Sequence, residues 1–279
     1  MTVAESHTVR LELLTCGDPF AGAAGAARSR RPPVLFVHGA YCGAWIWGES
    51  FLPYFCRHGF PARAVSLRGH GGSEGDVTWA SLADYVDDVE AAAERIGEPP
   101  ILIGHSMGGL VVQHFLARGH KVRAAVLMSS VPPSGLAGAA MHMSMFAPTL
   151  LWQLGLLQSL GPGSVSPQTI HDAFFSAATP ALKVAHLLPR MQRESQRIAT
   201  ELLAPAQPRP PDGPDRPPIL VIGGDADVFL PTNCLRESAT YFDGDLIVLK
   251  GAPHGLMLDT AWWQPAADTV IGWLDTKVA

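Results

Sequence analysis

The amino-acid sequence predicts an α/β protein built on a mostly parallel, doubly wound sheet that carries a helical insertion. Short apolar runs recur along the 279 residues, and helical segments separate them. The runs are continuous, which is typical of strands covered on both faces. A regular alternation of strands and helices indicates a doubly wound arrangement.

The predicted strands begin near the N-terminus. Thr8–Thr15 alternates apolar and polar residues, which predicts an antiparallel entry strand. Six later apolar runs predict the parallel strands of the sheet. They are Val34–Val37, Ala64–Leu67, Ile101–Ile103, Ala125–Met128, Ile219–Ile222 and Leu246–Leu249.

The helices predicted between these strands have recognisable ends. The first begins at Ser81, a capping residue with Asp84 three positions later, and it stops at Ile96 before Gly97. The other predicted helices are Met107–Ala117, Leu235–Phe242 and Ala261–Leu274. Asp18–Pro33, with its Gly/Ala repeats and three arginines, is predicted to be a mobile surface loop.

The stretch from Pro132 to Pro218 interrupts the alternation of strands and helices. It contains helical patterns without a convincing strand, and its first part is rich in Met and Leu. Seven prolines between Pro205 and Pro218 exclude both a helix and a central strand there. We therefore expect a core domain of residues 1–131 and 219–279. Residues 132–218 should form a helical cap, or lid, that ends in a Pro-rich linker.

Composition and charge exclude several classes of function. The formal net charge is −5 and no Lys/Arg-rich run occurs, so nothing indicates nucleic-acid binding. The longest apolar stretches fall well short of the ~20 residues that span a bilayer, and the N-terminus lacks a secretory pattern. We expect a cytoplasmic monomer or homodimer, without stable membrane insertion, that acts on a small molecule.

The cysteines and histidines give no indication of a metal site. Cysteines occur at Cys16, Cys42, Cys56 and Cys234, without a CxxC pair or a metal-ligand spacing to histidine. Free thiols in a reducing compartment are therefore expected. No phosphate-binding loop is visible either, so we expect neither metal nor cofactor.

Residues 104–108 form a G-x-S-x-G motif that directly follows a predicted strand and precedes a predicted helix. In this context the motif predicts a nucleophile elbow, a strained turn that exposes the hydroxyl of Ser106. The two glycines are needed because residues two before and two after the serine approach the turn too closely for a Cβ. The helix N-terminus would lie beneath a developing oxyanion.

A serine nucleophile needs a base, and the base needs an orienting acid. Asp225 and Asp227 follow the predicted strand at 219–222, and His254 follows the strand at 246–249. With these residues the sequence resembles the α/β-hydrolase family over essentially the whole chain. The family's G-x-x-D turn, followed by a proline, implies Asp227 as the acid and leaves Asp225 as the alternative. The resemblance implies His254 as the base.

The resemblance also implies an oxyanion hole and a branch of the family. The loop after the strand at 34–37 corresponds to the one that lends a backbone N–H, which implies Ala40 and Met107 as the two donors. Residues 38–45 resemble plant methylesterases and hydroxynitrile lyases. Lyases typically carry Thr and Lys where this chain has Gly39 and Leu256, so lyase activity is disfavoured. Cys42 lies at this mouth and is expected to line it.

The expected function is that of an esterase- or lysophospholipase-like serine hydrolase. It would cleave a carboxylic ester or thioester of a fairly hydrophobic small molecule through an acyl-enzyme. C–C bond hydrolysis and a cofactor-free lyase or oxygenase reaction are the alternatives, and a non-catalytic binding protein is a remote one.

The Met/Leu-rich lid predicts an apolar pocket, although the same residues could simply hold the lid helices together. The residues expected to contact substrate are Tyr41, Met145, Trp152, Phe174 and Leu256. Three further side chains of the lid are positively charged, and a solvated face paired with Glu194 and Glu201 is expected for them. They are Arg190, Arg193 and Arg197.

Overall fold

The computed structural model describes residues 9–16, 31–213 and 216–278, and within them the expected doubly wound sheet is found. Its seven strands lie in the order β1-β3-β2-β4-β5-β6-β7. Their bounds are β1 Leu13–Thr15, β2 Val34–Val37, β3 Ala62–Val65, β4 Ile101–His105, β5 Ala124–Met128, β6 Ile219–Gly224 and β7 Asp245–Leu249. Only β1 is antiparallel to its neighbour, as expected of an entry strand.

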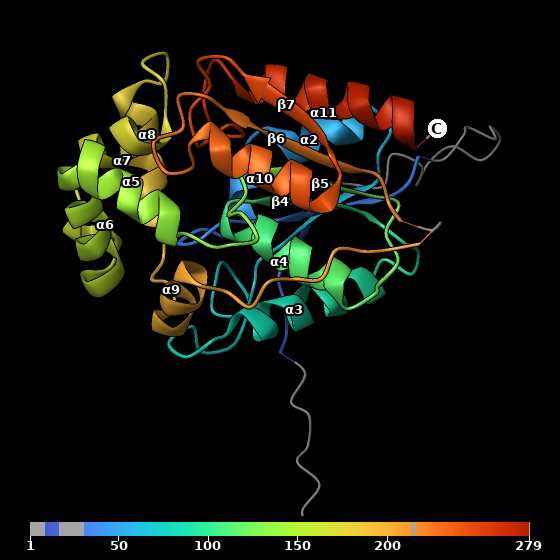
Figure 1. The fold of residues 1–279 in the computed structure, drawn as a ribbon. Coiled ribbons are helices and arrows are strands. Elements are labelled where there is room, and N and C mark those ends of the chain that lie inside the picture. The colour runs from blue at the N-terminus through green and yellow to red at the C-terminus, as the bar shows by residue number, and fades with distance from the viewer. Residues whose placement is uncertain (1–8, 17–30, 214–215, 279) are drawn as a thin grey trace, which may run out of the picture.

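Helices cover both faces of this sheet (Figure 1). One face carries α1 (Trp45–Gly48), α2 (Phe51–Arg57) and α11 (Trp263–Lys277). The other carries α3 (Leu82–Glu94), α4 (Met107–Ala117) and α10 (Thr232–Phe242). Successive residues of a strand enter opposite layers: Ile101 and Ile103 pack with the first set of helices and Leu102 with the second. The continuous apolar runs therefore fill two cores.

Some features expected from the local sequence are found in the structure, and others differ. The Ser81 side chain accepts the N–H of Asp84, and the Asp84 carboxylate accepts the N–H of Ser81, which completes the predicted capping box. The short helices α1 and α2 were not expected. The predicted final strand is half-exposed, because β7 is an edge strand that pairs only with β6. Most of the predicted loop at 18–33 lies outside the described residues.

The expectation of four free thiols is wrong for one pair. Cys16 and Cys56 form a disulfide with a Cα–Cα distance of 6.6 Å, whereas Cys42 and Cys234 are free. Cys16 directly follows β1, and Cys56 lies in α2, which packs against β3, the neighbour of β1. The two cysteines are 40 residues apart in sequence, so only the pairing of the strands brings them together.

The segment between β5 and β6 is helical in its described part, without a strand. We call residues 132–218 the insert. Its helices are α5 (Ala137–Phe146), α6 (Pro148–Leu160), α7 (Pro167–Phe174), α8 (Ala181–Leu187) and α9 (Gln196–Leu203). From Pro205 to Gly213 the chain is neither helix nor strand, as the prolines predict.

The insert does not lie as one body over the sheet. Figure 1 shows α5 to α8 gathered at one end of the molecule, whereas α9 lies beside α3. Ile198 and Leu202 of α9 belong to the same buried cluster as α3 and α4. The last helix of the insert is therefore packed onto the core. Across the described ranges, no helix is long and apolar enough to cross a membrane.

Candidate active site

Ser106 lies on the turn between β4 and α4 in a conformation that non-glycine residues rarely adopt. Its φ is 53° and its ψ is −118°. A Cβ on Gly104 would overlap the carbonyl oxygen of Gly108, and a Cβ on Gly108 would overlap the carbonyl oxygen of His38. Both glycines of the motif are thus required by close backbone approach, and the surrounding structure holds Ser106 in its strained conformation.

Asp227 and His254 are paired at the ends of β6 and β7. The Nδ1 of His254 lies 2.7 Å from Oδ2 of Asp227, and both side chains are buried. The other carboxylate oxygen of Asp227 accepts the backbone N–H groups of Phe229 and Leu230 at 2.9 and 3.0 Å. Asp225 instead accepts the N–H of Gly251 at 2.5 Å, which makes it a turn-capping residue. This geometry leaves Nε2 of His254 to exchange protons.

The imidazole of His254 is enclosed by three rings. Phe229 and Phe174 lie at centroid distances of 4.9 and 5.5 Å, and His105 lies at 4.7 Å. Burial, and secondarily the neighbouring His254, hold the pKa of His105 well below its ordinary value. The neutral His105 ring can donate from Nε2 to the carbonyl of His254, 3.0 Å away. No sequence pattern distinguished Phe229 or His105, although His105 adjoins the serine.

Ser106 and His254 line the same cavity. Within the described residues the hydroxyl of Ser106 makes no hydrogen bond to His254. Hydrogen bonds of this kind often tighten only when substrate is bound, so cavity placement is the relevant geometry.

The two residues expected to supply oxyanion donors come from different segments of the chain. Ala40 and Met107, the first residue of α4, both line the cavity, and neither backbone N–H donates a hydrogen bond in the part of the chain that the structure describes. His38 anchors the first loop: its Nδ1 lies 2.8 Å from the Gly39 carbonyl, and its Nε2 accepts the N–H of Leu67 at 3.0 Å. Burial, with His70 nearby, lowers the pKa of His38 to about 3, so its ring stays neutral.

The cavity has a volume of about 290 Å³ and mostly apolar walls. Tyr41 and Phe174, two of the residues expected to contact substrate, do line it. The three others do not line it. Met145 and Trp152 are 63% and 65% exposed, and Leu256 is fully buried among core residues.

Helix phase explains the exposed pair of residues. The residues of α5 and α6 that line the cavity are Ala140, Met143, Leu151, Leu154 and Gln158. Met145 lies two residues after Met143, and Trp152 lies one residue after Leu151. These offsets place both side chains on another side of their helix. Both helices are apolar on more than one side, so the sequence could not show which side faces the cavity.

Other expected site features differ in detail. Cys42 lines the cavity, and burial, followed by the nearby Glu194, raises its pKa to about 12, so it remains a thiol. Glu194 is not on a solvated face: it is 5% exposed and lines the cavity. Arg197 does pair with Glu201, at 2.7 Å. No group of three or more metal-ligating side chains occurs in the described ranges.

The chain is similar in sequence to known proteins. A family model described as "Alpha/beta hydrolase family" matches residues 34–268. A non-heme chloroperoxidase of Streptomyces lividans is 38% identical over 104 residues, which cover 36% of this chain and 37% of that protein. A chloroplastic methylesterase homologue of Arabidopsis thaliana is 34% identical over 83 residues, covering 29% of this chain and 21% of the homologue. The aligned segments thus span well under half of these relatives.

The fold is also shared with solved structures. A thermophilic esterase from Thermogutta terrifontis superposes with a TM-score of 0.70 at 19% sequence identity, covering 100% of this chain and 97% of the esterase. At this identity the likeness concerns the fold alone.

Proposed function

The chain belongs to the alpha/beta hydrolase family, and we propose that it is a serine hydrolase cleaving a carboxylic ester or thioester of a fairly hydrophobic small molecule. One observation carries the proposal. Nδ1 of His254 lies 2.7 Å from Oδ2 of Asp227, and His254 lines the same cavity as Ser106, whose backbone is strained. A base with an oriented acid beside an exposed hydroxyl is the arrangement that nucleophilic catalysis requires.

The proposed reaction has two steps. Ser106 Oγ attacks the acyl carbon while Nε2 of His254 takes the hydroxyl proton, and Asp227 stabilises the resulting imidazolium. The N–H groups of Ala40 and Met107 bind the negatively charged oxygen of the tetrahedral intermediate. His254 then protonates the leaving alcohol or thiol, and an acyl-enzyme remains. Water, deprotonated by His254, attacks this acyl group and releases the acid and Ser106.

The walls of the cavity support an apolar acyl or aryl group as the part of the substrate that is recognised. Leu151 and Leu154 of α6 and Met143 of α5 contribute side chains from the insert. We propose that residues 132–218 act as a cap on a core of residues 1–131 and 219–279, with α5 to α8 over the site. Apolar walls with few polar groups are typical of small-molecule pockets.

An ester and thioester series tests this function. Chromogenic acetyl to decanoyl esters and their thioester analogues would be assayed with the wild type and with Ser106→Ala. We expect turnover that depends on Ser106 and rises with acyl length until the cavity is full. Absence of hydrolysis across both series would reject the esterase proposal.

The resemblance to a chloroperoxidase favours one second candidate reaction. Hydrogen peroxide could attack the same acyl-enzyme in place of water, releasing a peracid and free Ser106, and the peracid could oxidise a halide. Halogenation of a dye that requires peroxide, halide, a carboxylic acid or ester and Ser106 would support it. Unchanged ester hydrolysis without any halogenation would exclude it.

A further inference from the structure

Tyr41 follows Ala40 in the oxyanion loop, and residues of the insert hold all of its polar groups. Its backbone N–H donates to Oε2 of Glu194 at 3.3 Å, and its carbonyl accepts the N–H of Gln192 at 2.9 Å. Its phenol donates to the side-chain oxygen of Gln158. The loop that carries the proposed oxyanion donor is thus fastened to the insert rather than only to the sheet.

The conformation of Tyr41 explains why this fastening is needed. Its φ is 64°, in the left-handed region that a tyrosine rarely adopts. Such a conformation persists only where the surroundings enforce it. The peptide that joins Ala40 to Tyr41 is shared by both residues, so a turn of Tyr41 toward ordinary φ would also reorient the Ala40 end of the loop.

Glu194 is itself rigidly held. Its Oε1 accepts the phenol of Tyr85 at 2.6 Å and the N–H of Ser195 at 2.8 Å, and its Oε2 lies 3.3 Å from Nε2 of His70. Burial alone would lower the pKa of His70, but Glu194, with smaller contributions from the Arg68 carbonyl and Asp88, raises it above its ordinary value. Burial alone would raise the pKa of Glu194, but His70, together with the donors Tyr85 and Ser195, lowers it. The two side chains form a buried ion pair.

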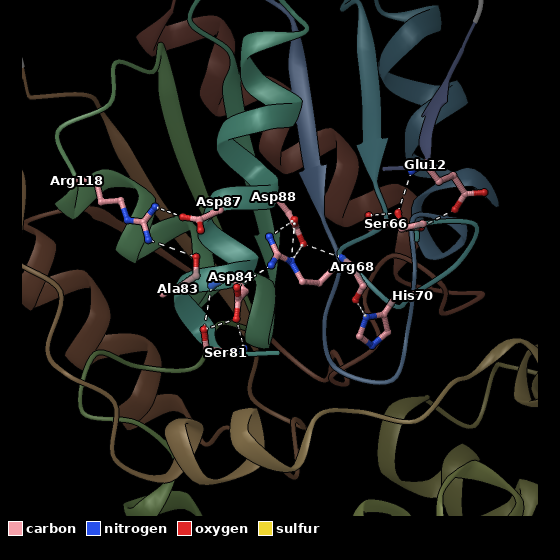
Figure 2. A network of polar contacts seen from close by, with 11 residues as sticks. Glu12, Ser66, Arg68, His70, Ser81, Ala83, Asp84, Asp87, Asp88 and Arg118 are labelled. Atoms are coloured by element: carbon pink, nitrogen blue, oxygen red, sulfur yellow. Dashed lines mark hydrogen bonds and ion pairs between the residues drawn. The ribbon is translucent and has the colours of Figure 1, made fainter. Parts of the chain in front are cut away.

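The core anchors the other end of this ion pair. His70 Nδ1 lies 3.1 Å from the carbonyl of Arg68, and the Arg68 guanidinium is bound to Asp88 and Asp84 of α3 (Figure 2). The loop after β3 therefore presents His70 from a fixed position. A chain of contacts runs from α3 through His70 and Glu194 to Tyr41.

We propose that Glu194 is a positioning residue for the oxyanion hole: through Tyr41, it aims the backbone N–H of Ala40 at the oxygen that becomes charged. The inference rests on the proposed function. It assigns to the insert a part in catalysis beyond covering the cavity, because the hole would be complete only when the segment 192–194 is seated against Tyr41 and His70.

An isosteric variant separates this role from simple packing. The carboxylate oxygens of Glu194 accept three hydrogen bonds and lie beside the imidazole of His70. A glutamine of the same shape accepts through one oxygen only and presents an NH₂ group in place of the other. Glu194→Gln therefore leaves Tyr41 or Ser195 without an acceptor. Tyr85→Phe is the matched control, since it removes a donor to the same carboxylate at Oε1 and leaves the bond to Tyr41 intact.

Steady-state kinetics and inhibitor binding measure the effect. Glu194→Gln should lower kcat about 10- to 100-fold with KM changed less than threefold, within the range for loss of one oxyanion donor or less. Binding of an alkyl boronic acid, which forms a tetrahedral adduct with the serine, should weaken by the same factor as kcat/KM. Tyr85→Phe, which removes one of the two donors at Oε1 and leaves the acceptor of the Tyr41 N–H in place, should lower kcat clearly less than Glu194→Gln does.

Different outcomes reject different claims. Equal kcat values for Glu194→Gln and Tyr85→Phe in an active enzyme, or a change in KM alone, would overturn the positioning role. A wild type inactive on all esters would instead reject the proposed function. If Glu194→Gln does not fold, amide exchange in the wild type decides: the Tyr41 N–H should be protected, and rapid exchange there would overturn the inference.

Discussion

The sheet edge and the insert build the two sides of one cavity in different ways. Ser106 directly follows β4, whereas Asp227 and His254 lie in the turns after β6 and β7, and backbone contacts hold these segments in place. Met143 and Leu154 come from α5 and α6, which have one or two buried residues each. The comparison shows that strand order determines where the proposed catalytic groups lie, whereas helix phase determines which residues of the insert line the cavity.

The largest effects should come from the sheet edge. Ser106→Ala or His254→Ala should each reduce kcat by about 10⁴ or more, because each removes a member of the proposed catalytic triad. Asp227→Asn should cost somewhat less and Asp225→Asn far less, since only Asp227 contacts His254. Steady-state ester hydrolysis by folded variants checks this order. A larger loss for Asp225→Asn would overturn the choice of acid.

Glycine-to-alanine substitutions should affect the free energy of unfolding differently at the sheet edge and in the insert. Gly108→Ala places a methyl group on backbone oxygens of Val37 and His38, so we expect a loss of about 2–4 kcal/mol in the free energy of unfolding. Gly155→Ala in α6 is the control, because its Cβ would meet nothing within 4 Å. It should be neutral or stabilising by roughly 0.5–1 kcal/mol. Urea unfolding measures both, and equal destabilisation would contradict this account.

A pair of neighbours in α6 tests the lid. Leu154→Ala should change the dependence of kcat/KM on acyl length, because its side chain lines the cavity. Each buried methylene of substrate can contribute up to about 0.8 kcal/mol, about fourfold in kcat/KM. Trp152→Ala, which trims a 65% exposed side chain, should leave the profile unchanged. If Trp152→Ala alters it and Leu154→Ala does not, the inward side of α6 is wrongly assigned.

The smallest effect concerns the ion pair that joins the regions. The pKa of His70 is raised, so its contribution to stability is complete below the ordinary value of 6.5 and is lost as pH rises through the raised pKa. The pKa of Glu194 is lowered, so its contribution is present above 4.5 and is lost as pH falls through the lowered pKa. The difference in unfolding free energy between the wild type and His70→Gln should therefore be largest between pH 4.5 and 6.5. A difference independent of pH would contradict the ion pair.

The sequence predicted the sheet edge better than the insert. Apolar runs and the G-x-S-x-G motif locate the strands and Ser106 because these signals are local. Strand order then brings the carboxyl ends together, so Asp227 and His254 could be placed without coordinates.

Residues whose role depends on contacts between distant segments could not be predicted. Glu194 was expected among solvated charges, but it pairs with His70, which lies 124 positions earlier (194 − 70) in another loop. The disulfide of Cys16 and Cys56 depends in the same way on β1 pairing with β3. Met145 and Trp152 are exposed instead of lining the cavity, and the sequence could not show this because apolar character alone does not fix the phase of a helix.

Mapping a fluorophosphonate adduct tests the central claim most directly, because this probe reacts with an activated serine hydroxyl and not with a merely structural one. The account predicts one adduct per chain, on the peptide that contains Ser106, with none in Ser106→Ala and slow labelling in His254→Ala. An unlabelled wild type, or an adduct on another residue that persists in Ser106→Ala, would contradict the assignment of Ser106 as an activated nucleophile.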